Sequence, residues 1–153
     1  MVGGGPVTVL VVGAALVDDL AHPTRVLAAR RTEPPRLAGG WELPGGKVED
    51  GEGAEQALHR ELAEELGVAV RLGAELPGPL AGAWDLPPSA RLRVWLAVVT
   101  DGVPAPLEDH DELRWLSRDQ WRSVAWLDAD LPVVAALEAL ADRDDDRDGA
   151  ARP

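Results

Sequence analysis

The chain has 153 residues, of which 46% are hydrophobic, and this is enough to build the core of one domain. Its formal net charge of −12 argues against a protein that binds polymeric DNA or RNA through the phosphates. The absence of cysteine excludes disulfides and thiol catalysis. No apolar run is long enough to span a membrane and the start lacks the pattern of a signal peptide, so we expect a cytoplasmic protein.

Apolar and β-branched runs predict the first elements of the chain. Val7–Val17 is predicted to be a buried strand, and Val26–Arg30 a short second strand. Glu33–Gly40 contains a Pro-Pro and a Gly-Gly pair and is predicted to be a loop. It leads into Trp41–Lys47, which reads WELPGGK.

The proline and the two glycines of this run favour a tight loop whose backbone can approach a ligand or a metal closely. A carbonyl oxygen of Gly45 or Gly46 is therefore a candidate metal ligand. The side chains in this loop that we expect to contact a substrate are those of Leu43 and Lys47.

A strong helix-forming segment follows, from Gly53 to Leu66, with Gly67 placed to end it. It carries Glu61, Glu64 and Glu65, whose i, i+3, i+4 spacing places them on one face. Three like charges there destabilise a helix unless a hard cation neutralises them, and carboxylate oxygens suit Mg²⁺ or Mn²⁺. The alternative interpretation is a solvated acidic face.

The metal interpretation is favoured because three further residues are in register with the helix: Gly46, Glu52 and Arg60. Arg60 precedes Glu64 by four residues and can pair with it or with Glu52, which would orient the carboxylates that bind the metal.

The rest of the chain predicts strands, loops and two helices. Strands are expected at Val68–Leu76, Leu92–Thr100 and Glu112–Leu116, and a Pro- and Gly-rich loop at Pro77–Ser89. Ser117 and Gln120 form a capping box for a short helix towards Trp126. Pro132 suits the first turn of a last helix that is expected to end near Ala141. The domain is thus expected to span residues 1–141, followed by a disordered acidic tail at 142–153. Strands interleaved with helices indicate an α+β or α/β sandwich.

From Gly46 to Val68 the sequence reads Gly-x5-Glu-x7-Arg-Glu-Leu-x-Glu-Glu-x-Gly-Val, which is the Nudix box without a mismatch. With the flanking runs Leu37–Glu52 and His110–Trp121, the chain resembles Nudix hydrolases, and among them the MutT-like nucleoside triphosphate pyrophosphohydrolases. The resemblance implies the Nudix α/β/α sandwich with a central mixed β-sheet. It also implies Mg²⁺-dependent attack of water on the β-phosphorus of an NTP or dNTP, releasing the monophosphate and pyrophosphate, in nucleotide-pool sanitation.

The resemblance assigns roles to the residues of the box. Those that match positions binding metal or activating water are Gly45, Gly46, Glu61, Glu64 and Glu65, and those that match supporting catalytic positions are Glu52 and Arg60. A further carboxylate, acting as general base or extra ligand, is expected at Glu108, with Asp109 next; the alternative is a solvated acidic loop. The neighbouring His110 is interpreted as a surface histidine of that loop, and the alternative is that it tunes the proposed base.

Three residues are expected to contact the base. Enzymes of this type that remove 8-oxo-dGTP read the base with an Asn, where this chain has Asp130. A carboxylate suits the exocyclic amine of cytosine, a protonated Asp130 could contact an oxidised guanine, and the alternative role is a helix N-cap. Arg31 matches a base-contacting Arg, or is a solvated charge at a strand end. Trp84 lies where relatives place a stacking aromatic, or covers the core.

Three functions follow from these observations. The first is a MutT-type pyrophosphohydrolase of 8-oxo-dGTP or of cytidine-type triphosphates, acting on a small nucleotide with Mg²⁺. The second is a Nudix hydrolase of another nucleoside diphosphate derivative, such as a nucleotide sugar. The third is a non-catalytic nucleotide-binding domain, which the complete set of box glutamates disfavours. The sequence determines neither the preferred base nor the oligomeric state.

Overall fold

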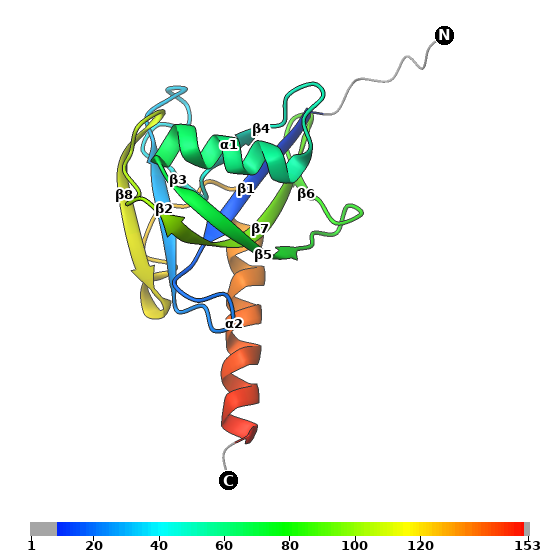
Figure 1. The fold of residues 1–153 in the computed structure, drawn as a ribbon, viewed down its shortest axis with the longest axis vertical. Coiled ribbons are helices and arrows are strands. Elements are labelled where there is room, and N and C mark those ends of the chain that lie inside the picture. Colours follow the sequence, from blue (N-terminus) through cyan, green and yellow to red (C-terminus); the bar gives the residue numbers. More distant parts are fainter. Residues whose placement is uncertain (1–8, 152–153) are drawn as a thin grey trace.

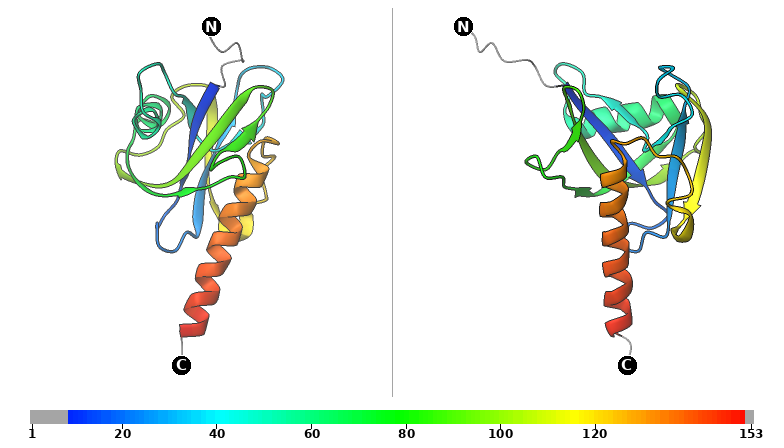
Figure 2. Two further views of the ribbon diagram at one scale, coloured as in Figure 1. Left: turned by 90° about the vertical axis from the view of Figure 1, so that its right-hand side faces the viewer. Right: turned by 180° about the vertical axis from the view of Figure 1, so that it is seen from behind.

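The computed structural model describes the backbone of residues 9–151 and the side chains of residues 9–143. Two β-sheets lie between two helices that cover opposite sides of the molecule (Figures 1 and 2). The mixed α/β architecture predicted from the sequence is therefore confirmed. Among the described residues, no helix is long and apolar enough to cross a membrane.

The larger sheet is mixed and has the strand order β4-β1-β7-β5, with β6 pairing to β7. Strand β1 runs parallel to β7, whereas β4, β5 and β6 pair antiparallel with their neighbours. The bounds of these strands are β1 Val9–Leu16, β4 Gly45–Lys47, β5 Ala69–Leu76, β6 Trp84–Leu86 and β7 Ala90–Asp101.

The smaller sheet is antiparallel and has the order β3-β2-β8. Its strands are β2 Arg25–Arg31, β3 Trp41–Glu42 and β8 His110–Ser117. Strands β3 and β4 are separated only by Leu43 and Pro44, so this short run links the two sheets. The WELPGGK segment therefore lies at the junction of the sheets.

Helix α1 (Ala54–Leu66) packs one apolar stripe on the larger sheet. Its residues Leu58, Leu62 and Leu66 are fully buried in a cluster with Val12 and Trp95. They recur every four residues, so they share one side of the helix. The glutamates at 61 and 65 follow Leu58 and Leu62 by three residues, so they lie on the stripe beside the leucines, and Glu65 is buried with them.

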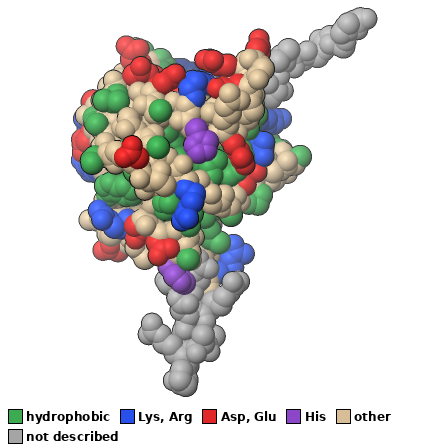
Figure 3. All heavy atoms as spheres, viewed as in Figure 1, with side chains coloured by type: hydrophobic (Ala, Val, Ile, Leu, Met, Phe, Trp, Pro, Cys, Tyr) green, Lys and Arg blue, Asp and Glu red, His purple; other side chains and the backbone are tan. Residues whose placement is uncertain are grey.

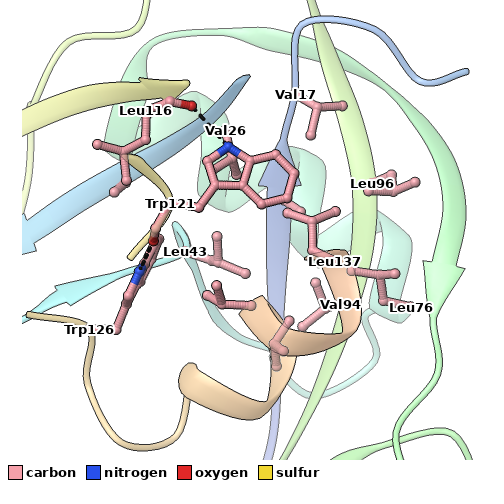
Figure 4. Packing of buried hydrophobic residues seen from close by; sticks show 14 of the residues in the cluster. Val17, Val26, Leu43, Leu76, Val94, Leu96, Leu116, Trp121, Trp126 and Leu137 are labelled. Carbon is pink, nitrogen blue, oxygen red and sulfur yellow. Dashed lines mark hydrogen bonds between the residues drawn. The ribbon is translucent and has the colours of Figure 1, made fainter. Parts of the chain in front are cut away.

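Helix α2 (Leu131–Ala151) covers the other side, where Leu137 packs with strand residues and with two tryptophans (Figure 4). The indole N–H of Trp121 donates to the carbonyl of Leu116 at 3.0 Å, and that of Trp126 donates to the carbonyl of Trp121 at 2.7 Å. These bonds satisfy the polar atoms of both rings inside the core. They also fix the segment that leads into α2.

Most of the predicted elements are confirmed, with bounds that differ by a few residues; Val7 and Thr8 of the first predicted strand lie outside the described residues. Two local predictions are wrong. The predicted loop Pro77–Ser89 contains β6, whose residues pair with Ala90–Leu92. The helix predicted after Ser117 is only a 3-10 turn, Arg118–Gln120, although the capping box is present.

The end of the last helix is also corrected, because α2 continues to Ala151 instead of stopping near Ala141. Arg118 Nη2 donates to both carboxylate oxygens of Asp142, at 3.0 and 3.2 Å, and this pair holds the turn that follows Ala141. Each further residue then gains a helical hydrogen bond without a new nucleation step. Residues 142–151 of the expected tail belong to α2, and residues 152–153 lie outside the described residues.

Candidate active site

The glutamates of α1 lie beside the glycines of β4, at one edge of the larger sheet. Gly67 ends the helix in the left-handed conformation, with φ 72°. The Glu61 carboxylate lies so close to the backbone of Gly46 that a Cβ at this position would overlap it, so the position requires glycine. The helix and the Gly-Gly strand of the box therefore meet as the sequence predicted, although they are separated by the loop at 48–53.

Arg60 is the centre of the polar network at this edge. Its Nε and Nη2 atoms donate to the two carboxylate oxygens of Glu52 at 2.7 and 2.9 Å, and Nη2 also donates to the carbonyl of Lys47 at 3.0 Å. Its Nη1 atom donates to Glu61 at 2.9 Å and to Glu64 at 3.2 Å. The bond to Glu52, followed by that to Glu61, raises the pKa of Arg60, so this residue stays charged. Arg60 therefore connects the box loop to the acidic face, as predicted.

Glu65 is the most buried of the three glutamates, with 7% of its surface exposed. Burial raises its pKa to about 8, and the charges of Glu61, Glu42 and Asp109 add to this effect. The backbone N–H of Gly45 donates to its Oε2 atom at 3.3 Å and opposes the shift. Glu65 is thus a desolvated acid in the middle of other carboxylates.

Arg60 is the positive charge that lies against the glutamates of the acidic face. Among the described residues, no group of three or more His, Cys, Asp or Glu side chains is arranged so that it could hold a metal ion. Arg60 occupies the position of counter-charge instead, because it binds both Glu61 and Glu64, and the Glu64 side chain is 49% exposed. Figure 3 shows Asp and Glu side chains at several places on the face of the molecule seen in Figure 1.

A small cavity of about 60 Å³ lies beside this edge, between the two sheets and the start of α2. Its polar lining comes from Glu42 and Asp130, and its apolar lining from Val11, Val12, Leu43, Leu86, Leu92 and Val94. Asp130 is 7% exposed, and its Oδ1 atom accepts a hydrogen bond of 3.2 Å from the backbone N–H of Leu43. Burial raises the pKa of Asp130 to about 8, and the charge of Glu42 adds to the shift. Among the described residues, the Asp130 carboxylate therefore accepts a hydrogen bond from the β3–β4 junction and none from the first turn of α2.

The other residues expected to contact the substrate are spread around this cavity. Arg31 reaches Glu42, to which its Nη1 atom donates at 2.9 Å, and so lies one residue away from the cavity wall. Lys47 is exposed. The indole N–H of Trp84 donates to the carbonyl of Leu76 at 3.0 Å, and the ring packs against the core, while Leu86 lines the cavity instead. The role of Trp84 as a core cover is thus the better supported of the two interpretations.

The loop before β8 is attached to the end of α1. The backbone N–H groups of Ala105 and Leu107 donate to the carbonyls of Leu66 and Glu65 at 3.1 and 3.0 Å. Glu108 and Asp109 are both exposed, but only the charge of Asp109 contributes to the raised pKa of Glu65. Asp109 therefore interacts electrostatically with the acidic face, whereas Glu108, the residue that the sequence favoured as general base or extra ligand, shows no such effect on Glu65.

Sequence reasoning missed two polar residues of this region. Glu42 was within a quoted motif but had no assigned role, and His110 was interpreted as a surface histidine. His110 is in fact buried, with 0% of its side chain exposed, and its Nε2 atom lies 2.9 Å from Oε2 of Glu42. No local pattern signals this pair, because the two residues are 68 positions apart.

A second depression, of about 220 Å³, lies at the opposite end of β1 and is lined by Val17, Asp18, Arg25, Val98, Val99 and Trp115. It is larger, but it contains none of the residues of the box. The carboxylate of Asp18 is already used by the backbone N–H of Arg25 at 2.8 Å and by Thr24. We therefore assign the chemistry to the smaller cavity and the adjoining acidic face.

The buried acid Asp130 predicts how stability depends on pH. Its pKa is about 8 in the folded chain and near 3.8 when exposed, so between these values only the folded state holds the proton. The free energy of unfolding should then fall by up to about 1.4 kcal/mol per pH unit as the pH rises through this window. The dependence should be weaker in Asp130→Asn and unchanged in Asp128→Asn, whose side chain is exposed. Urea unfolding at pH 5 to 8 in EDTA measures it, and equal slopes for wild type and Asp130→Asn would contradict the burial argument.

Comparison with known proteins identifies the family. The family model described as "NUDIX domain" matches residues 8–137. "Putative 8-oxo-dGTP diphosphatase 2" of Mycobacterium tuberculosis is 39% identical over 131 residues, covering 84% of this chain and 86% of that protein. "CTP pyrophosphohydrolase" of Escherichia coli is 33% identical over 119 residues, covering 76% and 84%. Among solved structures, the MutT NUDIX hydrolase from Burkholderia pseudomallei superposes with a TM-score of 0.63 at 33% identity, covering 74% of this chain and 86% of that one. The chain therefore belongs to the Nudix family and is a hydrolase of MutT type that acts on phosphorus-containing anhydrides.

Proposed function

We propose that the protein is a Mg²⁺-dependent pyrophosphohydrolase that converts (deoxy)nucleoside triphosphates to the monophosphate and pyrophosphate, in sanitation of the nucleotide pool. The observation that carries this proposal is the continuity between two sites. Glu65 and Gly45 belong to the acidic face, and Glu42 and Leu43, next in the same run, belong to the cavity that Asp130 lines. A triphosphate on the acidic face would therefore have its nucleoside directed towards this cavity.

The donor set of the acidic face fits a hard divalent cation such as Mg²⁺, with Mn²⁺ as a substitute. The residues that would hold it are Glu61, Glu64 and Glu65, with a carbonyl of Gly45 or Gly46. Burial and then the charge of Glu61 raise the pKa of Glu65, and a cation bound there would relieve this cost, which supports the fit. When bound, the metal would neutralise phosphate charge and lower the pKa of the attacking water.

The chain's own residues then position the reactants, since phosphoryl transfer needs placement and charge neutralisation more than covalent chemistry. Arg60, locked by Glu52, orients Glu61 and Glu64. A bound cation would lower the raised pKa of Glu65, and either Glu65 or a carboxylate of the loop before β8 would then accept the proton of the attacking water. In that loop we favour Asp109 over Glu108, because the charge of Asp109 acts on Glu65.

Asp130 is the proposed reader of the base. With a pKa of about 8 it holds a proton at neutral pH, and its acid group then offers one O–H donor besides the oxygen bound by Leu43. A protonated acid can donate to an acceptor atom of cytosine or of an oxidised guanine, whereas the carboxylate form suits only a donor such as the amine of cytosine. These two substrate classes agree with the relatives named 8-oxo-dGTP diphosphatase and CTP pyrophosphohydrolase.

The test is pyrophosphate release with Mg²⁺ at low, equal concentrations of 8-oxo-dGTP, dGTP, dCTP, 5-methyl-dCTP and CTP. We expect Asp130→Asn to change the ratio of kcat/KM between 8-oxo-dGTP and dCTP by about tenfold or more, as loss of one base contact does. Asp128→Asn, exposed and two residues away, is the matched control. No metal-dependent pyrophosphate release from any of the five nucleotides would refute the proposed function. An unchanged ratio in Asp130→Asn would leave Asp130 a structural residue of the β3–β4 junction.

A further inference from the structure

His110 and Glu42 form a buried pair at the cavity. His110 opens β8, and its side chain is completely buried, whereas the Glu42 side chain is 15% exposed. The Nε2 atom of His110 lies 2.9 Å from Oε2 of Glu42. A carboxylate can only accept hydrogen bonds, so the N–H of this pair is on Nε2 of His110, which donates the hydrogen bond to Glu42. The histidine therefore acts as a fixed donor towards Glu42.

Glu42 is held from two neighbouring strands at once. Arg31, at the end of β2, donates from Nη1 to the same Oε2 atom at 2.9 Å, and its own Nε is fixed by the carbonyl of Glu33 at 2.7 Å. Arg31 and His110 are paired across β2 and β8, and the backbone N–H of Thr32 donates to the carbonyl of Asp109 at 2.9 Å. The two donors are thus set by the backbone of the smaller sheet, in which β3 holds Glu42 on the other side of β2 (Figure 1).

Both of these bonds end on Oε2, which leaves the second oxygen for another partner. In the described part of the chain no hydrogen bond to Oε1 of Glu42 is formed. Glu42 lines the cavity together with Leu43 and Asp130, and its charge is close enough to Asp130 to raise the pKa of that acid. The geometry therefore presents one oriented acceptor at the wall of the cavity.

We propose that His110 is a positioning residue that holds Glu42 so that its Oε1 atom accepts a hydrogen bond from the nucleoside part of the substrate. The inference rests on the proposed function in one respect, namely that the occupant of the cavity is a nucleotide. His110 does not touch the substrate; it acts through Glu42, and its loss should weaken binding in the ground and transition states alike.

The test uses the full chain with His110→Leu, which removes the donor, and His110→Gln, which keeps an amide donor at a similar reach. His110→Leu is expected to raise KM for the preferred nucleotide about tenfold, the effect of losing one hydrogen bond to a charged group, with kcat changed less than about threefold. His110→Gln should restore KM to within about threefold of wild type. His59→Gln, an exposed histidine on α1, is the matched control and should change neither value.

A double-mutant cycle shows whether His110 works through Glu42. In a Glu42→Gln background, His110→Leu should raise KM less than about twofold further, because the group that it orients is already altered. An undiminished effect in that background, an unchanged KM in His110→Leu, or a loss confined to kcat would each overturn the inference. If His110→Leu does not fold, His110→Asn replaces it, since its amide is too short to reach Glu42, and the same outcomes apply.

Binding of dCMP and 8-oxo-dGMP, measured by calorimetry, separates this inference from the proposed function. If wild type releases no pyrophosphate, the proposed function fails, and the inference is then decided by the dissociation constant of the monophosphate. It stands if His110→Leu weakens that binding about tenfold and His110→Gln does not. It falls if the variants bind as wild type does, or if wild type binds neither monophosphate.

Discussion

Glu65→Gln is expected to lower kcat by about a hundredfold or more, the range seen when a group that activates water or binds the metal is removed. Glu65 is buried among Glu61, Glu42 and Asp109 and is the acid at which the acidic face meets β4. The amide has nearly the same shape, and its oxygen can still accept the 3.3 Å bond from the N–H of Gly45. The fold should therefore persist, and the loss should lie in catalysis.

Steady-state kinetics with the nucleotide found to be preferred measures this loss, and thermal unfolding checks the fold. Glu55→Gln is the matched control, because it makes the same change on an exposed position in the first turn of α1. Burying an amide in place of an acid removes the repulsion at this position, so the melting temperature in EDTA at pH 8 should not fall. Activity of Glu65→Gln within a few-fold of wild type would mean that the assignment of the ligand carboxylates is wrong.

Adding one methyl group to Gly45 or to Gly46 of β4 should separate catalysis from folding. In Gly46→Ala the new Cβ would overlap the carboxylate of Glu61, which is the far end of a flexible side chain and can swing away. We expect kcat to fall about tenfold or more, as when a group that orients the metal is displaced, with little change in stability. In Gly45→Ala the Cβ would overlap the carbonyl of Val12 and lie 2.7 Å from Cα of Gly13, which is backbone and cannot yield. We expect that variant to lose about 3 kcal/mol of stability.

Urea unfolding and kinetics on the three variants Gly45→Ala, Gly46→Ala and Gly53→Ala measure the two effects. Gly53→Ala is the control, because a Cβ there meets nothing within 4 Å and its φ of −76° suits alanine. If Gly46→Ala loses stability and Gly45→Ala does not, the packing of β4 against β1 and α1 is not as described. If Gly46→Ala keeps full turnover, Glu61 is not needed at the position where it now lies.

The elements that could be predicted from the sequence are those whose signal is local. The box helix has a regular leucine stripe and a terminal glycine, and its predicted end at Leu66 is confirmed. Apolar and β-branched runs predicted β1, β2 and β7, because a buried strand needs apolar residues along most of its length, and a weak alternation predicted β5. Strand β6 was missed, since three residues among prolines and glycines become a strand only by pairing with β7.

In the candidate site, too, the contacts with a local sequence signal were predicted and the long-range ones were not. The contact of Arg60 with Glu64 spans four residues and that with Glu52 spans eight, so helical spacing and the motif register were enough to predict them. The burial and the hydrogen-bond partners of single polar residues were not predictable in this way. Asp130 and His110 are polar residues that the sequence could place only as a base contact or cap and as a surface histidine; their burial depends on what the fold puts over them.

The sequence by itself determined the acidic face, because the helical period places Glu61, Glu64 and Glu65 on one side of any helix they form. The tertiary structure decided that Glu65 would be buried, that Asp130 would bind the N–H of Leu43 across 87 residues, and that Glu42 would be held by His110 across 68. The physical reason is that a pKa or a hydrogen bond inside a protein depends on the distance and desolvation of its partners. Sequence spacing determines the distance between two side chains only within one helix or strand. Between strands, the distances and the desolvation of the side chains follow from how the two sheets join at β3 and β4.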